Sequence, residues 1–357
     1  MKASLFTTAL AGLLGTAMIA SSAAAEVRLQ GAGATFPNPF YQRLVVEYQT
    51  LHPDVKVDYQ SIGSGGGIKA FTDKTVHFAG SDAPMSAKEI DAAGGADNII
   101  EVPSCAGGVV PTYNLPGISS DLNFTGEVLA DIFLGKISAW NDPAIAELNP
   151  GVDLPDTPIT PAYRTDGSGT TFVWTNYLCT QSDEFMQTVG KGKAVSWPVG
   201  QGGKGNEGVT QVVQQTVGAL GYVEQGYADH NNLPYGAIKN HDGMFVKASP
   251  ESVSEAGAGA VSHMEGQMLA ADIWNQPGDE AYAAASFTYL LVFKDLNNLP
   301  SKADAQALVD FLWWAIHDGQ QFATELDYAP LAAPVQAKVE EALKTITYKG
   351  EALTIGK

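Results

Sequence analysis

The sequence predicts an α/β protein with two domains. Segments with the period-two pattern of a β-strand alternate along the chain with segments whose apolar residues recur at helical spacing. This alternation is typical of an open α/β sheet. The chain has 357 residues, more than one hydrophobic core usually serves, so we expect two such domains.

The first predicted block begins at Val27. Two prolines near residue 38 suit the start of a helix, and a serine three residues before a glutamate forms a capping box. The expected elements are a helix with Phe40, Leu44, Val45 and Tyr48 on one face, a strand over 55–60, a short buried strand over 77–80, and a helix that opens with the capping box Ser86 to Glu89.

A second block begins near Cys105. Its expected elements are a strand over 109–113, a helix over 125–133, a strand over 159–163 and a helix over 171–178. A buried strand over 287–293 follows, and then a helix capped by Ser301 and Asp304 that buries Leu308, Phe311, Leu312 and Ile316.

Small, polar or glycine-rich residues follow the ends of four predicted strands. These loops are expected at 31–36, 62–67, 80–84 and 164–170. Each alone is most often a turn. In open α/β sheets, however, ligands bind just beyond the carboxyl ends of strands, so four such loops could converge on one crevice.

The segment from Arg164 to Thr170 has the sequence Arg-Thr-Asp-Gly-Ser-Gly-Thr and leads directly into a predicted helix. A guanidinium, two hydroxyls and glycine N–H groups therefore meet at a helix N-terminus, where unpaired amides and the helix dipole favour negative charge. The sequence predicts an oxyanion site here.

The N-terminus predicts export. One charge, Lys2, precedes an apolar run, and small residues end at Ala25, which is the pattern of a cleaved signal peptide over residues 1–25. No later stretch is long and apolar enough for a membrane span. We expect a soluble protein in the periplasm.

The chain is acidic, with 39 Asp and Glu against 20 Lys and Arg and a net charge of −19. Such a surface repels polyanions, so nucleic acid and acidic membranes are not expected partners. High solubility and a saline host remain alternative explanations of the acidity.

Two cysteines, Cys105 and Cys179, form an even count in an oxidising compartment. We expect a disulfide between them. The alternative is two buried thiols that act as small apolar side chains.

The chain resembles the periplasmic phosphate-binding proteins that serve ABC-type phosphate importers. The matching segments, in the order of the family pattern, are Gly-Ala-Gly-Ala-Thr-Phe-Pro at 31–37, Ile-Gly-Ser-x-Gly-Gly at 62–67, Ser-Asp-Ala-Pro at 81–84, Leu-Gly-Lys-Ile at 134–137, Arg-x-Asp-Gly-Ser-Gly-Thr at 164–170, Gly-Gly-Lys-Gly-Asn at 202–206 and Gly-Ala-Leu-Gly-Tyr-Val-Glu at 218–224. The resemblance covers nearly the whole chain after residue 25.

The resemblance implies a two-lobed periplasmic binding protein fold, with an open α/β sheet in each lobe and a hinge between them. Residues 26–104 and 286–357 would form the first lobe and residues 105–285 the second. The hinge is expected near 103–107 and 284–286. The implied function is high-affinity binding of inorganic phosphate and its delivery to a membrane permease by a monomer, without catalysis.

The resemblance also assigns the phosphate ligands. The implied contacts are Thr35, Phe36, Ser64, Asp82, Arg164, Ser168, Gly169 and Thr170. Arg164 would hold two phosphate oxygens with its planar fork, which lysine cannot reproduce. Asp166 would not touch the anion but would fix the rotamer of Arg164. A surface ion pair is the alternative for these two residues.

Asp82 is predicted to set selectivity. A carboxylate beside an anion repels it unless a proton lies between them. Phosphate carries at least one proton at neutral pH and sulfate carries none, so Asp82 would accept a hydrogen bond from phosphate and reject sulfate. A simple turn or helix-capping aspartate is the alternative.

The competing function is a secreted phosphatase or phosphoryl-transfer enzyme with Ser64 or Ser168 as nucleophile. Neither serine has the Gly-x-Ser-x-Gly sequence of a nucleophile elbow, and Gly-Gly-Lys-Gly at 202–205 lacks the spacing of a P-loop. The six histidines show no metal-ligand spacing, so neither a metal nor a cofactor is expected.

Overall fold

The computed structural model describes residues 26–118, 121–264 and 269–356, and the predicted signal peptide lies outside them. The strands are β1 (Val27–Gly33), β2 (Val55–Ser61), β3 (Phe78–Ser81), β4 (Ile99–Tyr113), β5 (Asn123–Phe124), β6 (Thr160–Arg164), β7 (Gln201–Gly203), β8 (Ala219–Glu224), β9 (Ala237–Lys239), β10 (Phe245–Val246), β11 (Ala285–Phe293), β12 (Thr347–Tyr348) and β13 (Glu351–Ala352). The α-helices are α1 (Asn38–Leu51), α2 (Ser64–Thr72), α3 (Ala87–Ala92), α4 (Gly126–Leu134), α5 (Pro143–Ala146), α6 (Gly169–Gln181), α7 (Asp183–Thr188), α8 (Gly205–Gln215), α9 (Gln225–His230), α10 (Pro250–Gly257), α11 (Lys302–Ile316) and α12 (Ala333–Leu343).

One hydrogen-bonded sheet of eight strands runs through the molecule in the order β2-β1-β3-β11-β4-β8-β6-β7. The three strands at the β2 end are parallel to one another, and so are the three at the β7 end. The long strand β4 joins the two sets, because its residues up to Gly108 pair with β11 and its residues from Val109 pair with β8. Both joining strands are buried along their whole length.

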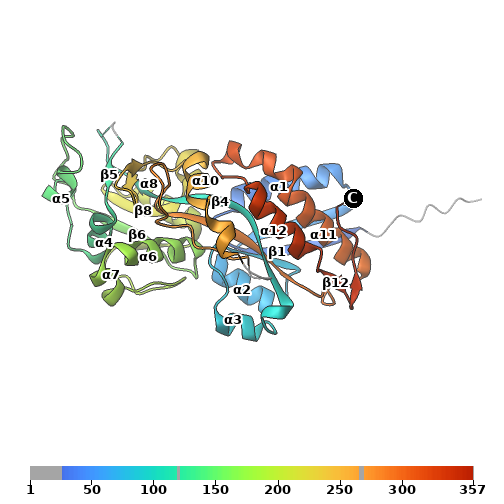
Figure 1. The fold of residues 1–357 in the computed structure, drawn as a ribbon. Helices are drawn as coiled ribbons and strands as arrows, with labels where there is room; N and C mark the ends of the chain where they lie inside the picture. Colours follow the sequence, from blue (N-terminus) through green and yellow to red (C-terminus); the bar gives the residue numbers. More distant parts are fainter. Residues whose placement is uncertain (1–25, 119–120, 265–268, 357) are drawn as a thin grey trace, which may run out of the picture.

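We call the part built on β1, β2 and β3 the first lobe and the part built on β6, β7 and β8 the second lobe. In the first lobe α1 and α11 lie on one side of the sheet and α2 and α3 on the other (Figure 1). In the second lobe α8 packs on one face, where Gly221 meets Val209 and Val213, and α6 packs on the other, where Trp174 stacks on Tyr222. The predicted α/β class is therefore confirmed, and the residue limits of the lobes remain a prediction.

The predicted elements are found with small shifts at their ends. The helix over 40–48 is part of α1, and the helix over 125–133 is α4, which is capped by the Thr125 hydroxyl. Both predicted caps are present, since Ser86 and Glu89 form a capping box and the Ser301 hydroxyl accepts the N–H of Asp304. The strand over 109–113 is only the second part of β4.

The glycine-rich segment after β2 is not a loop, contrary to the prediction. Helix α2 begins at Ser64, directly after Gly63 with a φ of 85°. Gly67 lies in this helix against β1, and a Cβ added there would lie 2.5 Å from the Cα of Gly33. The glycines therefore serve close helix-to-sheet packing, which a pattern of turn residues does not distinguish from a loop.

The predicted disulfide is wrong, because Cys105 and Cys179 are both free and buried. Cys105 lies in the middle of β4 and pairs with Thr288 of β11, whereas Cys179 lies near the end of α6. The two thiols have different surroundings: Cys105 is near Glu224 and Asp82, and Cys179 is near Lys191. They behave as buried apolar side chains, and burial raises the pKa of each.

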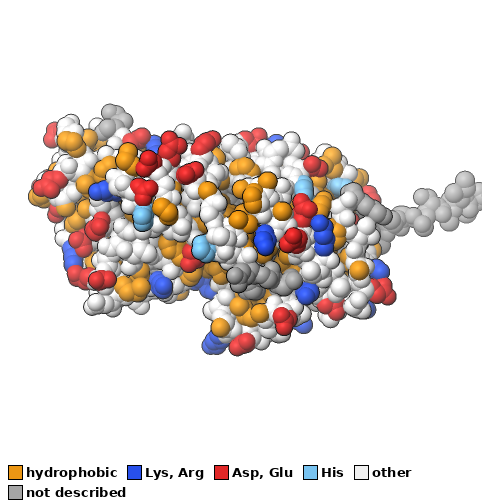
Figure 2. Space-filling model, in the orientation of Figure 1, with side chains coloured by type: hydrophobic (Ala, Val, Ile, Leu, Met, Phe, Trp, Pro, Cys, Tyr) orange, Lys and Arg blue, Asp and Glu red, His pale blue; other side chains and the backbone are white. Residues whose placement is uncertain are grey.

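Acidic side chains are spread over both lobes on the face seen in Figure 2, in keeping with the net charge of −19. Among the described residues, no helix has both the length and the apolar character that a membrane span requires.

Candidate functional site

The predicted ligand residues lie together where the two lobes meet. Thr35 and Phe36 follow β1, Asp82 follows β3, and Ser64 is the first residue of α2. The second lobe contributes Arg164 at the end of β6 and residues 168–170 at the start of α6. We call this set the ring; its members are Thr35, Phe36, Ser64, Asp82, Arg164, Ser168, Gly169 and Thr170. All are buried, and none of those with a side chain is more than 5% exposed.

Direct contacts join the two sides of the ring. The N–H of Gly169 donates to the Ser64 hydroxyl at 3.1 Å, and the N–H of Gly65 donates to the carbonyl of Gly167 at 2.8 Å. A Cβ added to Gly169 would lie 2.3 Å from a carboxyl oxygen of Asp82, so only glycine fits there. At the rim, Lys193 of the second lobe forms an ion pair with Glu89 of the first at 2.7 Å. The lobes are therefore in contact over the ring.

Arg164 is the fixed positive group of the ring. Its Nε and Nη2 donate to the two carboxyl oxygens of Asp166 at 2.9 and 2.5 Å, and its Nη1 donates to the Thr170 hydroxyl at 3.3 Å. Burial pushes the pKa of Asp166 upward, but the bonds from Arg164 and from the N–H of Gly205 outweigh it and hold this pKa below its usual value. A guanidinium has five N–H protons, so two remain without an acceptor among the described residues.

Backbone donors surround Arg164. Within the described residues, the N–H groups of Thr35, Phe36 and Thr170 have no hydrogen-bond acceptor. Ser168 caps α6 by accepting the N–H of Thr171 at 2.9 Å, which leaves its own hydroxyl proton available. Buried N–H groups without a partner are rare in folded proteins. Their concentration at the N-terminus of α6 and after β1 is suited to an anion.

Asp82 is the carboxyl group that faces these donors. It is 1% exposed, and burial raises its pKa from 3.8 to about 7, against the opposing effects of the Thr288 hydroxyl, Arg164 and the Ser64 hydroxyl. Near neutral pH the group therefore exchanges a proton readily. An anion next to it is stabilised only if a proton is shared between the two.

The Ser64 hydroxyl was predicted to donate to phosphate, but in this structure it donates to Asp82. Its hydroxyl accepts the N–H groups of Gly169 and Asp82 and donates to a carboxyl oxygen of Asp82 at 3.3 Å. That last bond is long for O–H···O⁻. The proton of Ser64 is directed at Asp82 in this structure, and its donation to a bound anion remains a prediction.

Thr288 is a site residue that the sequence analysis missed. It lies on β11, and its hydroxyl donates to Asp82 Oδ1 at 2.8 Å. The sequence signal was a single buried threonine inside the otherwise apolar stretch from Phe287 to Phe293. Thr288 fixes one carboxyl oxygen of Asp82, and the other lies against Ser64 and Gly169.

Replacing Thr288 by valine should weaken phosphate binding by about tenfold, because one hydrogen bond to a buried charged group is lost. Isothermal titration of purified protein with phosphate measures the change. Thr288→Ser is the matched control, since it keeps the hydroxyl and should bind within about twofold of wild type. Equal affinity of the valine and serine variants would exclude the role of Thr288.

The raised pKa of Asp82 also predicts a stability change. The folded protein holds this proton more tightly than the unfolded chain, so Asp82 lowers the free energy of unfolding as pH rises from 3.8 to about 7. A pKa difference of this size corresponds to about 4 kcal/mol in the free energy of unfolding. Without ligand, Asp82→Asn should therefore be more stable than wild type at pH 8 and nearly equal at pH 4, as measured by urea unfolding. If Asp82→Asn is less stable than wild type at pH 8, burial of the charged carboxylate does not destabilise the folded protein.

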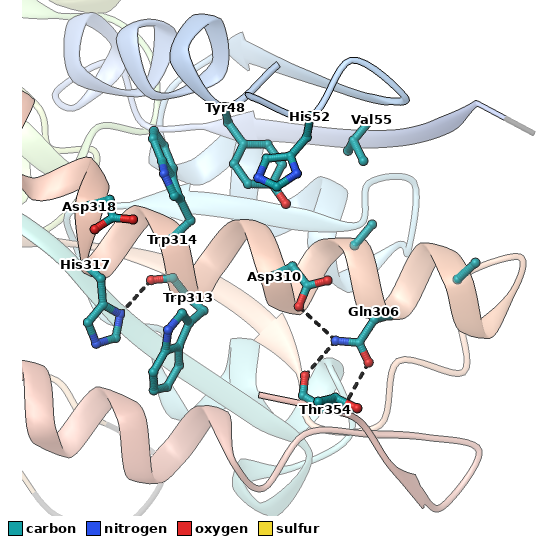
Figure 3. Close-up of a pocket in the computed structure, with 12 residues that line it drawn as sticks. Tyr48, His52, Val55, Gln306, Asp310, Trp313, Trp314, His317, Asp318 and Thr354 are labelled. Atoms are coloured by element: carbon teal, nitrogen blue, oxygen red, sulfur yellow. Dashed lines mark hydrogen bonds between the residues drawn. The ribbon is translucent and has the colours of Figure 1, made fainter. Parts of the chain in front are cut away.

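A separate groove of about 670 Å³ lies between α1 and α11 (Figure 3). Its lining includes Tyr48, Trp313 and Trp314 together with the acids Asp310 and Asp318. It shares no residue with the ring. Carboxylates at its wall make it unfavourable for an anion.

Two α/β lobes that meet over a buried set of anion donors define the class of solute-binding proteins. In keeping with this class, the family model described as PBP superfamily domain matches residues 20–318. The chain is 43% identical to the phosphate-binding protein PstS of Pasteurella multocida, over 92% of this chain and 93% of that protein. It is 41% identical to PstS of Haemophilus influenzae, over 89% and 92%. The chain belongs to the PstS family of phosphate-binding proteins, within the PBP superfamily.

Solved structures agree on the fold. A phosphate-binding protein from Stenotrophomonas maltophilia superposes with a TM-score of 0.68 at 19% identity, covering 88% of this chain and 93% of that one. A high-affinity periplasmic phosphate-binding protein, PfluDING, solved with phosphate, superposes with a TM-score of 0.69 at 21% identity, covering 92% and 96%. The two-lobed fold is thereby confirmed.

Proposed function

We propose that this chain binds inorganic phosphate in the ring and delivers it to the membrane permease of an ABC-type importer. The relatives named phosphate-binding proteins, at 43% and 41% identity over most of their length, support this function. The ligands are the ring residues, with Asp166 holding Arg164 in place.

One observation carries the proposal: buried donors without acceptors converge beside a single buried carboxyl group. The donors are the spare N–H protons of Arg164, the N–H groups of Thr35, Phe36 and Thr170, and the Ser168 hydroxyl. Several of these bonds would be charge-assisted and would favour tight binding. Asp82 adds the one acceptor, which suits a tetrahedral anion that still carries a proton.

Delivery requires that the lobes open and close. The buried ring and the contacts across it describe a closed arrangement, and phosphate exchange needs these contacts to separate. The predicted hinge segment 103–107 lies within β4, and the predicted hinge segment 284–286 covers the start of β11. We propose that the chain works as a periplasmic monomer after removal of residues 1–25 and that the permease recognises its closed form.

Catalysis is not part of this proposal. Ser64 accepts two N–H groups and Ser168 caps α6, and neither hydroxyl is bonded to a histidine among the described residues. A serine nucleophile needs an adjacent general base. Binding without turnover therefore fits the site better than a phosphatase.

Isothermal titration with phosphate and sulfate tests the proposal. We expect one site per chain, a Kd for phosphate at or below about 1 μM, and no detectable heat with sulfate at the same concentrations. Incubation with a chromogenic phosphate ester should give no product above the buffer rate. Absence of phosphate binding, or turnover proportional to protein concentration, would contradict it.

A further inference from the structure

Asn206 lies completely buried between two hydroxyl groups of the ring. It is the second residue of α8, in the second lobe. Its Nδ2 donates to the hydroxyl of Thr35 at 2.7 Å and to that of Thr170 at 3.1 Å. One side chain thus contacts ring residues of both lobes.

The orientation of this amide is fixed by the backbone. The N–H of Glu224 donates to Oδ1 of Asn206 at 3.0 Å. A backbone N–H can only donate, so the oxygen of the amide must face Glu224 and the NH₂ group must face the ring. The two protons of Nδ2 are then both used, one for each threonine.

The Thr35 hydroxyl can make only one further hydrogen bond, as a donor. A hydroxyl oxygen accepts two hydrogen bonds and donates one. Thr35 Oγ1 accepts from Nδ2 of Asn206 and also from the N–H of Asn206 at 3.1 Å. Both acceptor positions are occupied, and the described residues offer no acceptor for its proton. The hydroxyl can only donate, and the remaining direction is the ring.

The Thr170 hydroxyl is constrained in the same way. It accepts from Nδ2 of Asn206 and from Nη1 of Arg164. Its proton too has no acceptor within the described part of the chain. The amide of Asn206 therefore supplies one of the two accepted bonds at each hydroxyl and helps to set both as donors.

We propose that Asn206 is a positioning residue that turns the hydroxyl protons of Thr35 and Thr170 toward the bound anion. This inference rests on the proposed function, since it assumes that phosphate occupies the ring. Both threonine hydroxyls already accept two hydrogen bonds, so neither can accept the proton of a bound phosphate. The proton of the anion is then directed to Asp82, the only ring carboxylate.

The position of Asn206 also links hydroxyl orientation to contact between the lobes. Thr35 belongs to the first lobe, whereas Asn206 and Thr170 belong to the second. Separation of the lobes would remove both bonds from Asn206 to Thr35. The Thr35 hydroxyl is therefore oriented for the anion only when the lobes meet.

Titration of Asn206 variants with inorganic phosphate tests the inference. Asn206→Ala should weaken binding by about 10²-fold, because both hydroxyls become free to rotate away from the anion. Asn206→Asp has the same shape and can still accept the N–H of Glu224, but its second oxygen would accept the threonine protons. It should weaken binding at least as much. The exposed Asn141→Asp adds the same charge to the second lobe and should bind within about twofold of wild type.

A double-mutant cycle separates orientation from a general structural role. In a background with Thr35→Val and Thr170→Val there are no hydroxyls to orient, so Asn206→Ala should cost less than about threefold. Thermal unfolding of each ligand-free variant shows whether it is folded. If Asn206→Ala does not fold, Asn206→Asp replaces it in the cycle.

The outcomes are distinguishable. Asn206→Ala could lower the affinity for phosphate equally in the wild-type protein and in the Thr35→Val, Thr170→Val protein, or both Asn206 variants could keep wild-type affinity. Either result would overturn the role of Asn206 and leave phosphate binding intact. A wild-type protein that does not bind phosphate would overturn the proposed function, and the inference with it.

Discussion

Replacing Arg164 by lysine should weaken phosphate binding by about 10³-fold. The two spare N–H protons of the guanidinium provide two charge-assisted bonds of about 2 kcal/mol each. A lysine ammonium cannot span both carboxyl oxygens of Asp166 and also present two parallel donors to the anion. The side chain is only 1% exposed, so water cannot replace the lost bonds. Isothermal titration with phosphate measures the effect.

The control is Arg28→Lys, because Arg28 also pairs with a neighbouring carboxylate, Glu26, but is 70% exposed. This variant should bind phosphate as wild type does. If Arg164→Lys stays within about fivefold of wild type, the guanidinium is not the clamp that we describe.

Asp82→Asn should remove the discrimination between phosphate and sulfate. A buried site built for a ligand hydroxyl rejects an analogue without it by roughly 10⁴ to 10⁵. An amide at position 82 carries no charge and can donate to an unprotonated oxygen. Sulfate should then bind, and the ratio of the two dissociation constants should fall below about 10.

Glu101→Gln is the matched control for that change. Glu101 is another buried carboxyl group of the first lobe, and burial raises its pKa to about 7 as well. It accepts the N–H of Met85 and has no bond to a ring residue among the described contacts. Selectivity should be unchanged in this variant. Sulfate binding by both variants would point to a general loosening of the first lobe.

Part of the ring could be predicted from local sequence signals, and the resemblance to phosphate-binding proteins implied its other members. The serine N-cap of α6, the Arg164–Asp166 pair two residues apart, and Asp82 after a short buried strand are all encoded within a few residues. The order of the strands and helices predicted the fold class, and the local signals predicted an oxyanion site; contact of the ring with phosphate stays a prediction.

The missed residues act over long sequence distances. Thr288 bonds to Asp82 across 206 positions, and Asn206 bonds to Thr35 across 171. No local pattern specifies such contacts, because they depend on how β11 and α8 pack against the first lobe. The mistaken disulfide has the same cause, since the spacing of Cys105 and Cys179 in sequence does not give their distance in the fold.

The role that we assign to Asp82 is to admit only an anion that brings a proton. Competition between phosphate and sulfate for the wild-type protein at pH 8 tests this role of Asp82. If the site rejects sulfate by about 10⁴, we predict that a thousandfold excess of sulfate displaces only about one tenth of the bound phosphate. Displacement of half the phosphate by an equal concentration of sulfate would contradict the claim.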